Sequence, residues 1–133
     1  MKAKVILTLA LILVSASALA QKITDANYTT IGYISSDGTV QNANYSTIGH
    51  IYLDGTVKNA NYQTIAHIKS DGTVQNSNYS TIGHIKSDGT VQNAYYSTIG
   101  HVRDGKIQDA SYRTIAHADG VKTAWAAFFI FFW

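Results

Sequence analysis

Short β-prone stretches alternate with polar turn residues along most of the chain, with a period of 17 residues that shortens to 16 at the last unit. A typical unit, residues 71–87, contains a Thr-Val-Gln-Asn stretch and a Thr-Ile-Gly-His-Ile stretch. Threonine, asparagine, glycine and β-branched residues dominate and no 3.6-residue apolar period appears, so these stretches predict strands. A tyrosine separates the two stretches in each unit, at Tyr28, Tyr45, Tyr62, Tyr79, Tyr96 and Tyr112. The chain is therefore an internal β-repeat.

Asp-Gly pairs join successive units and predict β-hairpin turns that fix the strand register. In most units the loop has three residues, such as Leu53 to Gly55, and a left-handed glycine there sets Ile51 opposite Val57. The fifth unit is one residue shorter, and a two-residue Asp-Gly loop still sets Val102 opposite Ile107. Because a slip of one residue would turn each apolar pair to the other face, we expect these pairs to form a core layer.

Strand alternation places Thr47 and Gly49 on the face of Ile51, and Ile48 and His50 on the opposite face. Both faces then carry apolar surface, and equal hairpins favour an all-β fold that curls into a shallow closed barrel of about five to six antiparallel hairpins. An open β-solenoid is the alternative. We expect the half-units at the two ends, residues 22–25 and 114–118, to pair and close the ring. The pattern leaves a five-fold ring with a closing segment and a six-fold ring both open.

The recurring Tyr-x-Thr-Ile-Gly-His/Tyr-Ile and Asp-Gly-Thr-Val-x-Asn-Ala motifs resemble the bacterial beta-flower proteins, particularly the five-fold beta-flower proteins. The resemblance covers nearly all of the chain after residue 20, including the Phe-rich terminus. It implies a shallow, rotationally symmetric barrel of hairpins, and it implies no established activity.

Residues 1–20 have the pattern of a secretory signal peptide: Lys2 and Lys4, an apolar stretch, and small residues ending in Ala20. A membrane-anchoring helix is the alternative, but the apolar stretch is shorter than the ~20 residues that a span needs. We expect cleavage after Ala20 and an exported protein, periplasmic or extracellular. The predicted organisation is a signal peptide (1–20), a hairpin-repeat domain (21–123) and an apolar aromatic tail (124–133). Without the two lysines, eight basic residues balance eight aspartates.

This composition argues against catalysis and nucleic-acid binding. The chain contains neither glutamate nor cysteine, and all eight aspartates have a place in the repeat, six of them in Asp-Gly pairs. Asp25 and Asp109 take the slot that asparagine holds in the other units. No carboxylate or thiol is left as a distinctive acid, base or nucleophile, and no basic stripe is present. We therefore expect a non-enzymatic protein without a cofactor.

Two rings of repeated side chains are the remaining candidates for binding. One repeat position holds Tyr33 and then His50, His67, His84, His101 and His117. Equivalent positions on successive hairpins lie two strands, roughly 9–10 Å, apart, so these histidines are weak candidates for metal ligands and more plausible as a pH-sensitive surface. The tyrosines offer stacking faces to a sugar or another ligand, although we expect them mainly to pack the turns between hairpins.

The tail, residues 124–133, has no polar side chain and contains every Phe and Trp of the chain. Each aromatic ring left in water forgoes several kcal/mol, at ~25 cal/mol per Å². The tail therefore fills or caps the barrel, inserts into a membrane, hydrophobic partner or homo-oligomer interface, or acts as a terminal sorting signal of the outer-membrane type. The expected function is an exported binding or structural module with the tail packed in the barrel, and the alternative is a membrane-associated protein. The interaction residues expected in either case are Trp125, Phe128, Phe129, Ile130, Phe131, Phe132 and Trp133.

Overall fold

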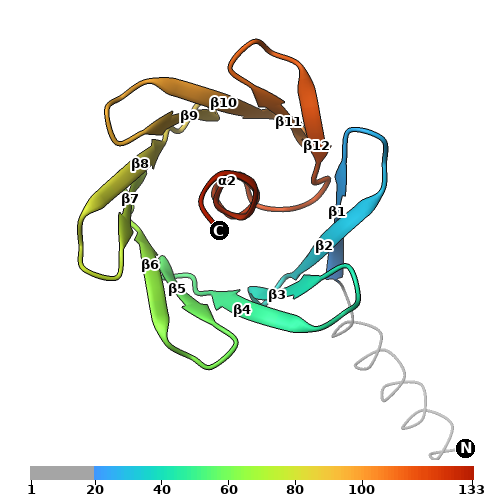
Figure 1. Ribbon diagram of the computed structural model, residues 1–133, viewed down its shortest axis with the longest axis horizontal. Coiled ribbons are helices and arrows are strands. Elements are labelled where there is room, and N and C mark those ends of the chain that lie inside the picture. Colours follow the sequence, from blue (N-terminus) through green and yellow to red (C-terminus); the bar gives the residue numbers. More distant parts are fainter. Residues whose placement is uncertain (1–19) are drawn as a thin grey trace, which may run out of the picture.

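A computed structural model describes residues 20–133, so the predicted signal peptide lies outside the described residues except for Ala20. Twelve antiparallel strands form one closed ring around a short C-terminal helix (Figure 1). The elements are β1 (Ala20–Asp25), β2 (Thr30–Ser35), β3 (Thr39–Asn42), β4 (Thr47–Ile51), β5 (Thr56–Asn59), β6 (Thr64–Ile68), β7 (Thr73–Asn76), β8 (Thr81–Ile85), β9 (Thr90–Asn93), β10 (Thr98–Arg103), β11 (Lys106–Asp109), β12 (Thr114–His117) and α2 (Thr123–Phe131). The predicted closed barrel is confirmed, and the open solenoid is wrong.

Consecutive strands pair in six hairpins that project outward, which we call petals: β1–β2, β3–β4, β5–β6, β7–β8, β9–β10 and β11–β12 (Figure 1). Each petal ends in a four-residue tip turn with tyrosine at its third position: 26–29, 43–46, 60–63, 77–80, 94–97 and 110–113. Five Asp-Gly turns join one petal to the next. The ring is therefore six-fold in its petals, with five Asp-Gly hairpins and one junction of a different kind.

That sixth junction is the seam, where β12 pairs with β1 through Thr24 opposite His117 and Asp25 opposite Ala116. The two half-units thus close the ring as expected. The predicted register also holds, since Ile51 faces Val57 and Val102 faces Ile107. Both the three-residue loop and the two-residue loop keep the apolar pair in place. The left-handed turn glycine is confirmed as well, with a φ of 91° at Gly55.

A bulge in every petal changes the predicted facing of some side chains. In β3–β4, Gln41 faces Thr47 and Val40 faces Gly49, so Ile48 is an extra residue. Thr47 therefore shares the face of Gln41, not the inner face of Ile51 and Gly49. Ile48 packs against the buried core, so the prediction that it lies away from the core with His50 is also wrong. An inserted residue breaks strict alternation, and this places the apolar repeat positions on the core side.

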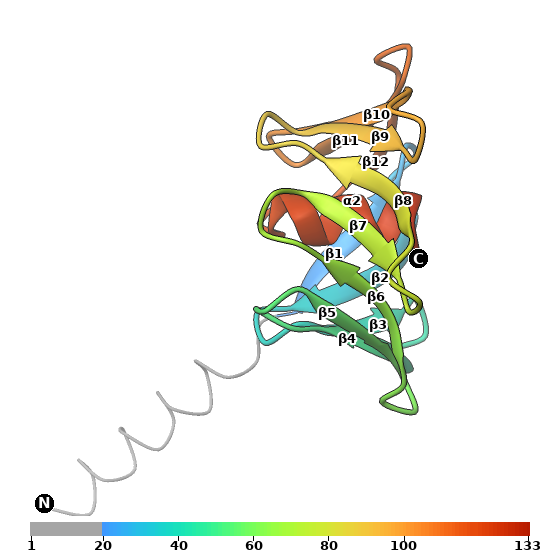
Figure 2. The ribbon, with the colours of Figure 1, turned by 90° about the vertical axis from the view of Figure 1, so that its left-hand side faces the viewer.

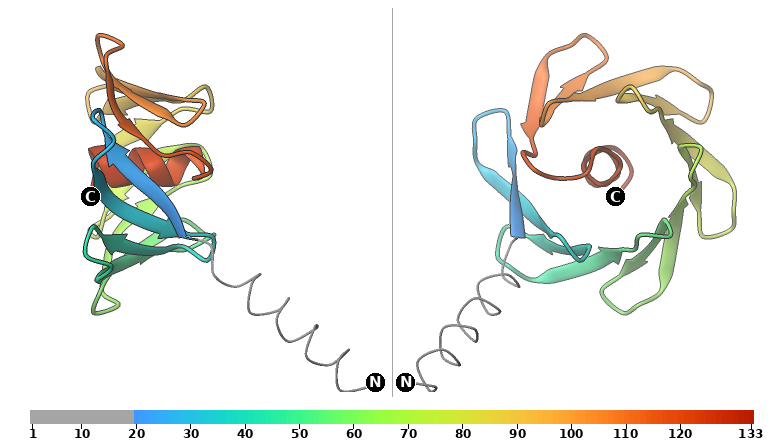
Figure 3. Two further views of the ribbon diagram at one scale, coloured as in Figure 1. Left: turned by 90° about the vertical axis from the view of Figure 1, so that its right-hand side faces the viewer. Right: turned by 180° about the vertical axis from the view of Figure 1, so that it is seen from behind.

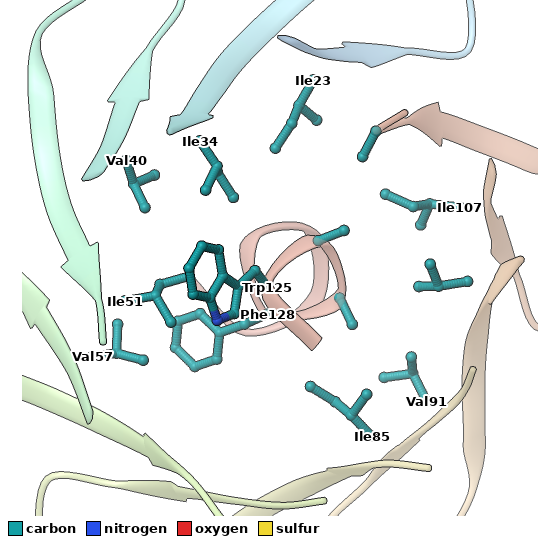
Figure 4. Packing of buried hydrophobic residues seen from close by; sticks show 14 of the residues in the cluster. Ile23, Ile34, Val40, Ile51, Val57, Ile85, Val91, Ile107, Trp125 and Phe128 are labelled. Carbon is teal, nitrogen blue, oxygen red and sulfur yellow. The ribbon is translucent and has the colours of Figure 1, made fainter. Parts of the chain in front are cut away.

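The tail forms α2, which lies inside the ring and along its axis (Figures 1 and 2). Seen from behind, the helix is again enclosed by the strands (Figure 3). Trp125, Ala126, Ala127 and Phe128 are buried and contact the rows of Ile and Val side chains that line the ring (Figure 4). A helix that is apolar all round is stable where it is covered on all sides. Of the three predicted fates of the tail, the structure shows the first, packing within the barrel.

Close contact between helix and ring depends on residues without large side chains at one inward position of each petal. Gly32, Gly49, Ala66, Gly83, Gly100 and Ala116 occupy that position. A Cβ added at Gly32 would lie 2.6 Å from Phe129, and one at Gly49 would lie 2.6 Å from Trp133. Gly83 and Gly100 contact Phe132 and Phe131 in the same way. The ring thus provides recesses for the aromatic side chains of the tail.

Candidate functional site

The six tip turns hold a tyrosine in a backbone conformation that tyrosine rarely adopts. In the β5–β6 petal, Tyr62 has a φ of 61°, and the five equivalent tyrosines have φ between 64° and 66°. The Asn59 side chain stabilises this turn because its Oδ1 accepts the N–H groups of Asn61 and Gln63, both at 3.0 Å. The Tyr62 N–H donates to the Asn59 carbonyl at 3.0 Å. The left-handed region costs a bulky residue free energy, so the fold keeps tyrosine here against its backbone preference.

The same acceptor role explains why aspartate replaces asparagine in two units. Asp109 Oδ1 accepts the N–H groups of Ser111 and Arg113 at 2.9 and 3.0 Å. The bond from the Arg113 N–H is the main reason that the pKa of Asp109 lies below its usual value. Either residue type supplies the oxygen that the turn needs, so these aspartates serve the fold.

Each tip tyrosine stacks on a side chain of the preceding petal. Tyr62 lies 4.8 Å from His50, ring centroid to centroid, with an interplanar angle of 12°. The other histidine stacks have centroid distances of 4.2–4.5 Å and pair Tyr79 with His67, Tyr96 with His84, Tyr112 with His101 and Tyr28 with His117. The sixth stack joins Tyr45 to Tyr33 at 4.5 Å. The predicted packing of these tyrosines thus takes a specific form: each ring bridges two petals.

The Tyr45–Tyr33 stack carries an additional hydrogen bond. The Tyr33 hydroxyl donates to the Tyr45 hydroxyl at 2.9 Å, and this bond is the main cause that raises the pKa of Tyr33. In both kinds of stack the tip tyrosine stays largely open to solvent, because these residues are 59–72% exposed although one ring face is stacked. The result is a ring of six oriented aromatic faces, one on each petal.

The histidines that the repeat aligned are not gathered by the fold. His50, His67, His84, His101 and His117 each lie against a tyrosine of the next petal, half-buried or buried. Within residues 20–133, no three His, Cys, Asp or Glu side chains come close enough to share a metal ion. A site that needs several ligands at 2.0–2.2 Å is not formed by this arrangement.

The predicted interaction residues of the tail lie mostly inside the ring. Trp125 and Phe128 are buried, and Phe129, Ile130, Phe131 and Phe132 are partly buried against the core. Trp133 is 39% exposed and packs edge-on against Phe128 at 5.7 Å. Over the part of the chain that the structure describes, no helix is long and apolar enough to cross a membrane.

A second surface feature is a hollow of about 550 Å³ at the start of α2. Lys69 and Lys86 line it together with turn residues and Thr123. It lies at two neighbouring Asp-Gly junctions, β6–β7 and β8–β9, and not at the tips.

The chain was compared with models of known protein families, and the model described as 5-fold beta-flower protein matches residues 20–133. The chain belongs to the beta-flower family. Neither the curated proteins nor the solved structures yield a match. The predicted resemblance is confirmed, and this beta-flower has twelve strands in six petals.

The tyrosine–histidine stacks and the left-handed tyrosines of this beta-flower were not predicted from sequence. The stacks join residues of different petals, so they depend on the curvature of the closed ring. A signal for the left-handed conformation was present, since the tyrosine follows a turn-forming Asn-x-Asn segment in several units.

Proposed function

We propose that this beta-flower is an exported, non-catalytic binding module, and that the six tip turns are its binding surface. The observation that supports this is the tyrosine at the left-handed position of every tip, a residue that is 59–72% exposed in the six copies. Asparagine or glycine would fit that backbone at lower cost. Strain that recurs in every copy is expected where the side chain has a task.

The symmetry of the ring indicates what kind of partner such a surface fits. Six equivalent tips point outward from one closed ring (Figure 1). Weak contacts at several tips gain avidity when the partner also repeats its binding groups. The proposed partner is therefore an extended surface outside the cell that offers the same group many times.

Sedimentation with cell envelopes isolated from the producing cells tests this proposal. The chain without residues 1–20 is compared with a variant in which all six tip tyrosines are replaced by Asn, which tolerates the left-handed backbone. Wild-type protein is expected in the pellet with the envelopes. The amount of variant in the pellet should be at least about tenfold lower, because the avidity from several tips is lost.

The matched control is Leu53→Ala, because Leu53 is 83% exposed but lies in an Asp-Gly turn away from the tips. This control should sediment like wild type. A wild-type protein that stays in the supernatant, or a folded tip variant that sediments equally well, would overturn the proposal.

Membrane association through the tail is the second candidate, and the exposed Trp133 is the observation that favours it. The packing of the preceding aromatics in the ring weighs against it, since they would have to leave the core to reach lipid. Flotation of the protein with liposomes separates the two ideas. If Trp133→Ala abolishes flotation, the tail is an anchor, and if wild type does not float, the anchor is excluded.

A further inference from the structure

We propose that the tip turns bind uncharged carbohydrate, with a sugar ring lying on the exposed face of each tip tyrosine. This inference rests on the proposed function and names its ligand class. Three features of the tips carry it: the orientation of the tyrosine ring, the polar groups beside it, and the six-fold repetition.

The tyrosine ring is held in one orientation before any ligand arrives. The Tyr62 backbone is fixed by the Asn59 hydrogen bonds, and its inner face rests on His50 at 4.8 Å. Because the ring has little freedom left to lose, a flat apolar ligand face that covers its outer side pays a small entropic cost. The apolar C–H face of a pyranose is such a ligand face.

The polar groups beside the ring are neutral donors and acceptors in every petal except the last, where Arg113 is charged. The residues that flank the tip tyrosines are Asn27 and Thr29, Asn44 and Ser46, Asn61 and Gln63, Asn78 and Ser80, Tyr95 and Ser97, and Ser111 and Arg113. All twelve of these residues are exposed. A surface of Tyr, Asn and Ser combines rigid aromatic area with adaptable hydrogen bonding, which suits the hydroxyl groups around a sugar.

Charge argues against the other extended ligands. Arg113 is the single charged side chain among the tip turns, and its Nε pairs with Asp109 at 3.1 Å. Anionic polymers and anionic lipid surfaces are drawn by unpaired basic clusters, which the six tips do not offer. A repeating neutral polysaccharide matches both the chemistry and the repetition of the petals.

A printed array of neutral and anionic oligosaccharides tests the ligand class, with phosphatidylethanolamine–phosphatidylglycerol vesicles as a separate arm. Wild type is expected to bind neutral hexose or N-acetylhexosamine glycans. Replacing the tyrosines of alternate petals (Tyr28, Tyr62 and Tyr96) by Asn should lower apparent affinity at least about tenfold, because half of the contacts are lost. Leu53→Ala should bind like wild type.

A measurement on the unaltered protein guards against variants that fail to fold. In wild type with isotope-labelled tyrosine rings, chitotriose or cellotriose should shift the ring signals of tip tyrosines more than those of Tyr52, which lies at the start of an Asp-Gly turn.

Absence of binding to every neutral glycan on the array, or binding that the Tyr→Asn changes leave intact in a folded protein, would overturn the carbohydrate proposal. If envelope binding still depends on the tips while the array stays empty, the binding module stands and its ligand is not a neutral sugar. Binding confined to anionic glycans or to vesicles likewise rejects the proposal and directs attention to the lysine-lined hollow or to the tail.

Discussion

At the residue scale, this beta-flower is built on short side chains that accept backbone hydrogen bonds in turns. Asp71 Oδ1 accepts the Thr73 N–H at 2.9 Å, and Asp37, Asp54 and Asp88 repeat this bond in other Asp-Gly turns. The bond from the following threonine N–H is the main cause that lowers the pKa of each of these carboxyls. A lowered pKa means that the folded protein prefers the charged carboxylate.

These bonds predict acid lability with a defined sign. A carboxyl whose folded pKa lies below its unfolded value, about 3.9, stabilises the fold above that pH, and the contribution is lost as pH falls through the folded pKa. Thermal melts from about pH 7 to about pH 3 should show the loss. Changing all four aspartates to Asn keeps the acceptor oxygen, so the Tm should then fall less on acidification. An unchanged slope would show that these turns do not control acid stability.

At the element scale, the helix fits into the ring because inward glycines of the strands face aromatic residues of the tail. The sequence predicted only part of this arrangement. Strands, hairpin register and ring closure followed from the repeat, because apolar positions and turn lengths determine them locally. The helix α2 did not, since an apolar segment of nine residues has no polar face to show a period. The inward glycines were visible in the sequence, but their purpose appears only beside Phe129, Phe131, Phe132 and Trp133.

Gly83→Ala tests this fit. The new methyl group would collide with the Phe132 ring and lie 2.6 Å from the Gln92 carbonyl oxygen. Overpacking of this kind costs about 1–3 kcal/mol of unfolding free energy. Because Ala66 and Ala116 occupy equivalent positions, the strand itself accommodates alanine. Combining Gly83→Ala with Phe132→Leu should therefore recover part of the loss in a double-mutant cycle measured by urea unfolding. Phe128→Leu is the matched control, and strict additivity with Phe132→Leu would contradict the prediction.

The seam is the weakest junction of the ring and makes its own prediction. Two residue pairs join β1 to β12, whereas three or four pairs join the strands at each of the five Asp-Gly junctions. The stack of Tyr28 on His117, at 4.3 Å, then carries a larger share of the junction. We expect Tyr28→Asn to speed amide exchange in β1 and β12, because that end can open locally. Tyr62→Asn should have no such local effect on β5 and β4, and equal exchange in both variants would argue against a weak seam.

At the scale of the whole molecule, the ring and the tail form one cooperative unit. The inner rows of Ile and Val side chains are buried against α2, and α2 is in turn buried by these rows (Figure 4). Closed ladders leave no free sheet edge, so stability comes from backbone bonding around the circumference and apolar burial at the centre. We expect neither the ring without α2 nor α2 without the ring to stay folded.

Deletion of residues 125–133 should therefore abolish the cooperative thermal transition and expose apolar surface to a hydrophobic dye. Trp133→Ala, which removes a side chain that is 39% exposed, should keep a cooperative transition at a lower Tm. A truncated chain that melts as sharply as wild type and becomes more soluble would show that the ring is self-sufficient.

The position of α2 after all twelve strands in the sequence has a consequence for the order in which the molecule can form. Strand β1 gains its second neighbour only when β12 has been synthesised, and the centre of the ring is filled only when α2 follows. A growing chain can form individual petals, but its interior is incomplete until α2 has emerged from the ribosome. We therefore expect the nascent chain to stay loosely packed through most of its synthesis.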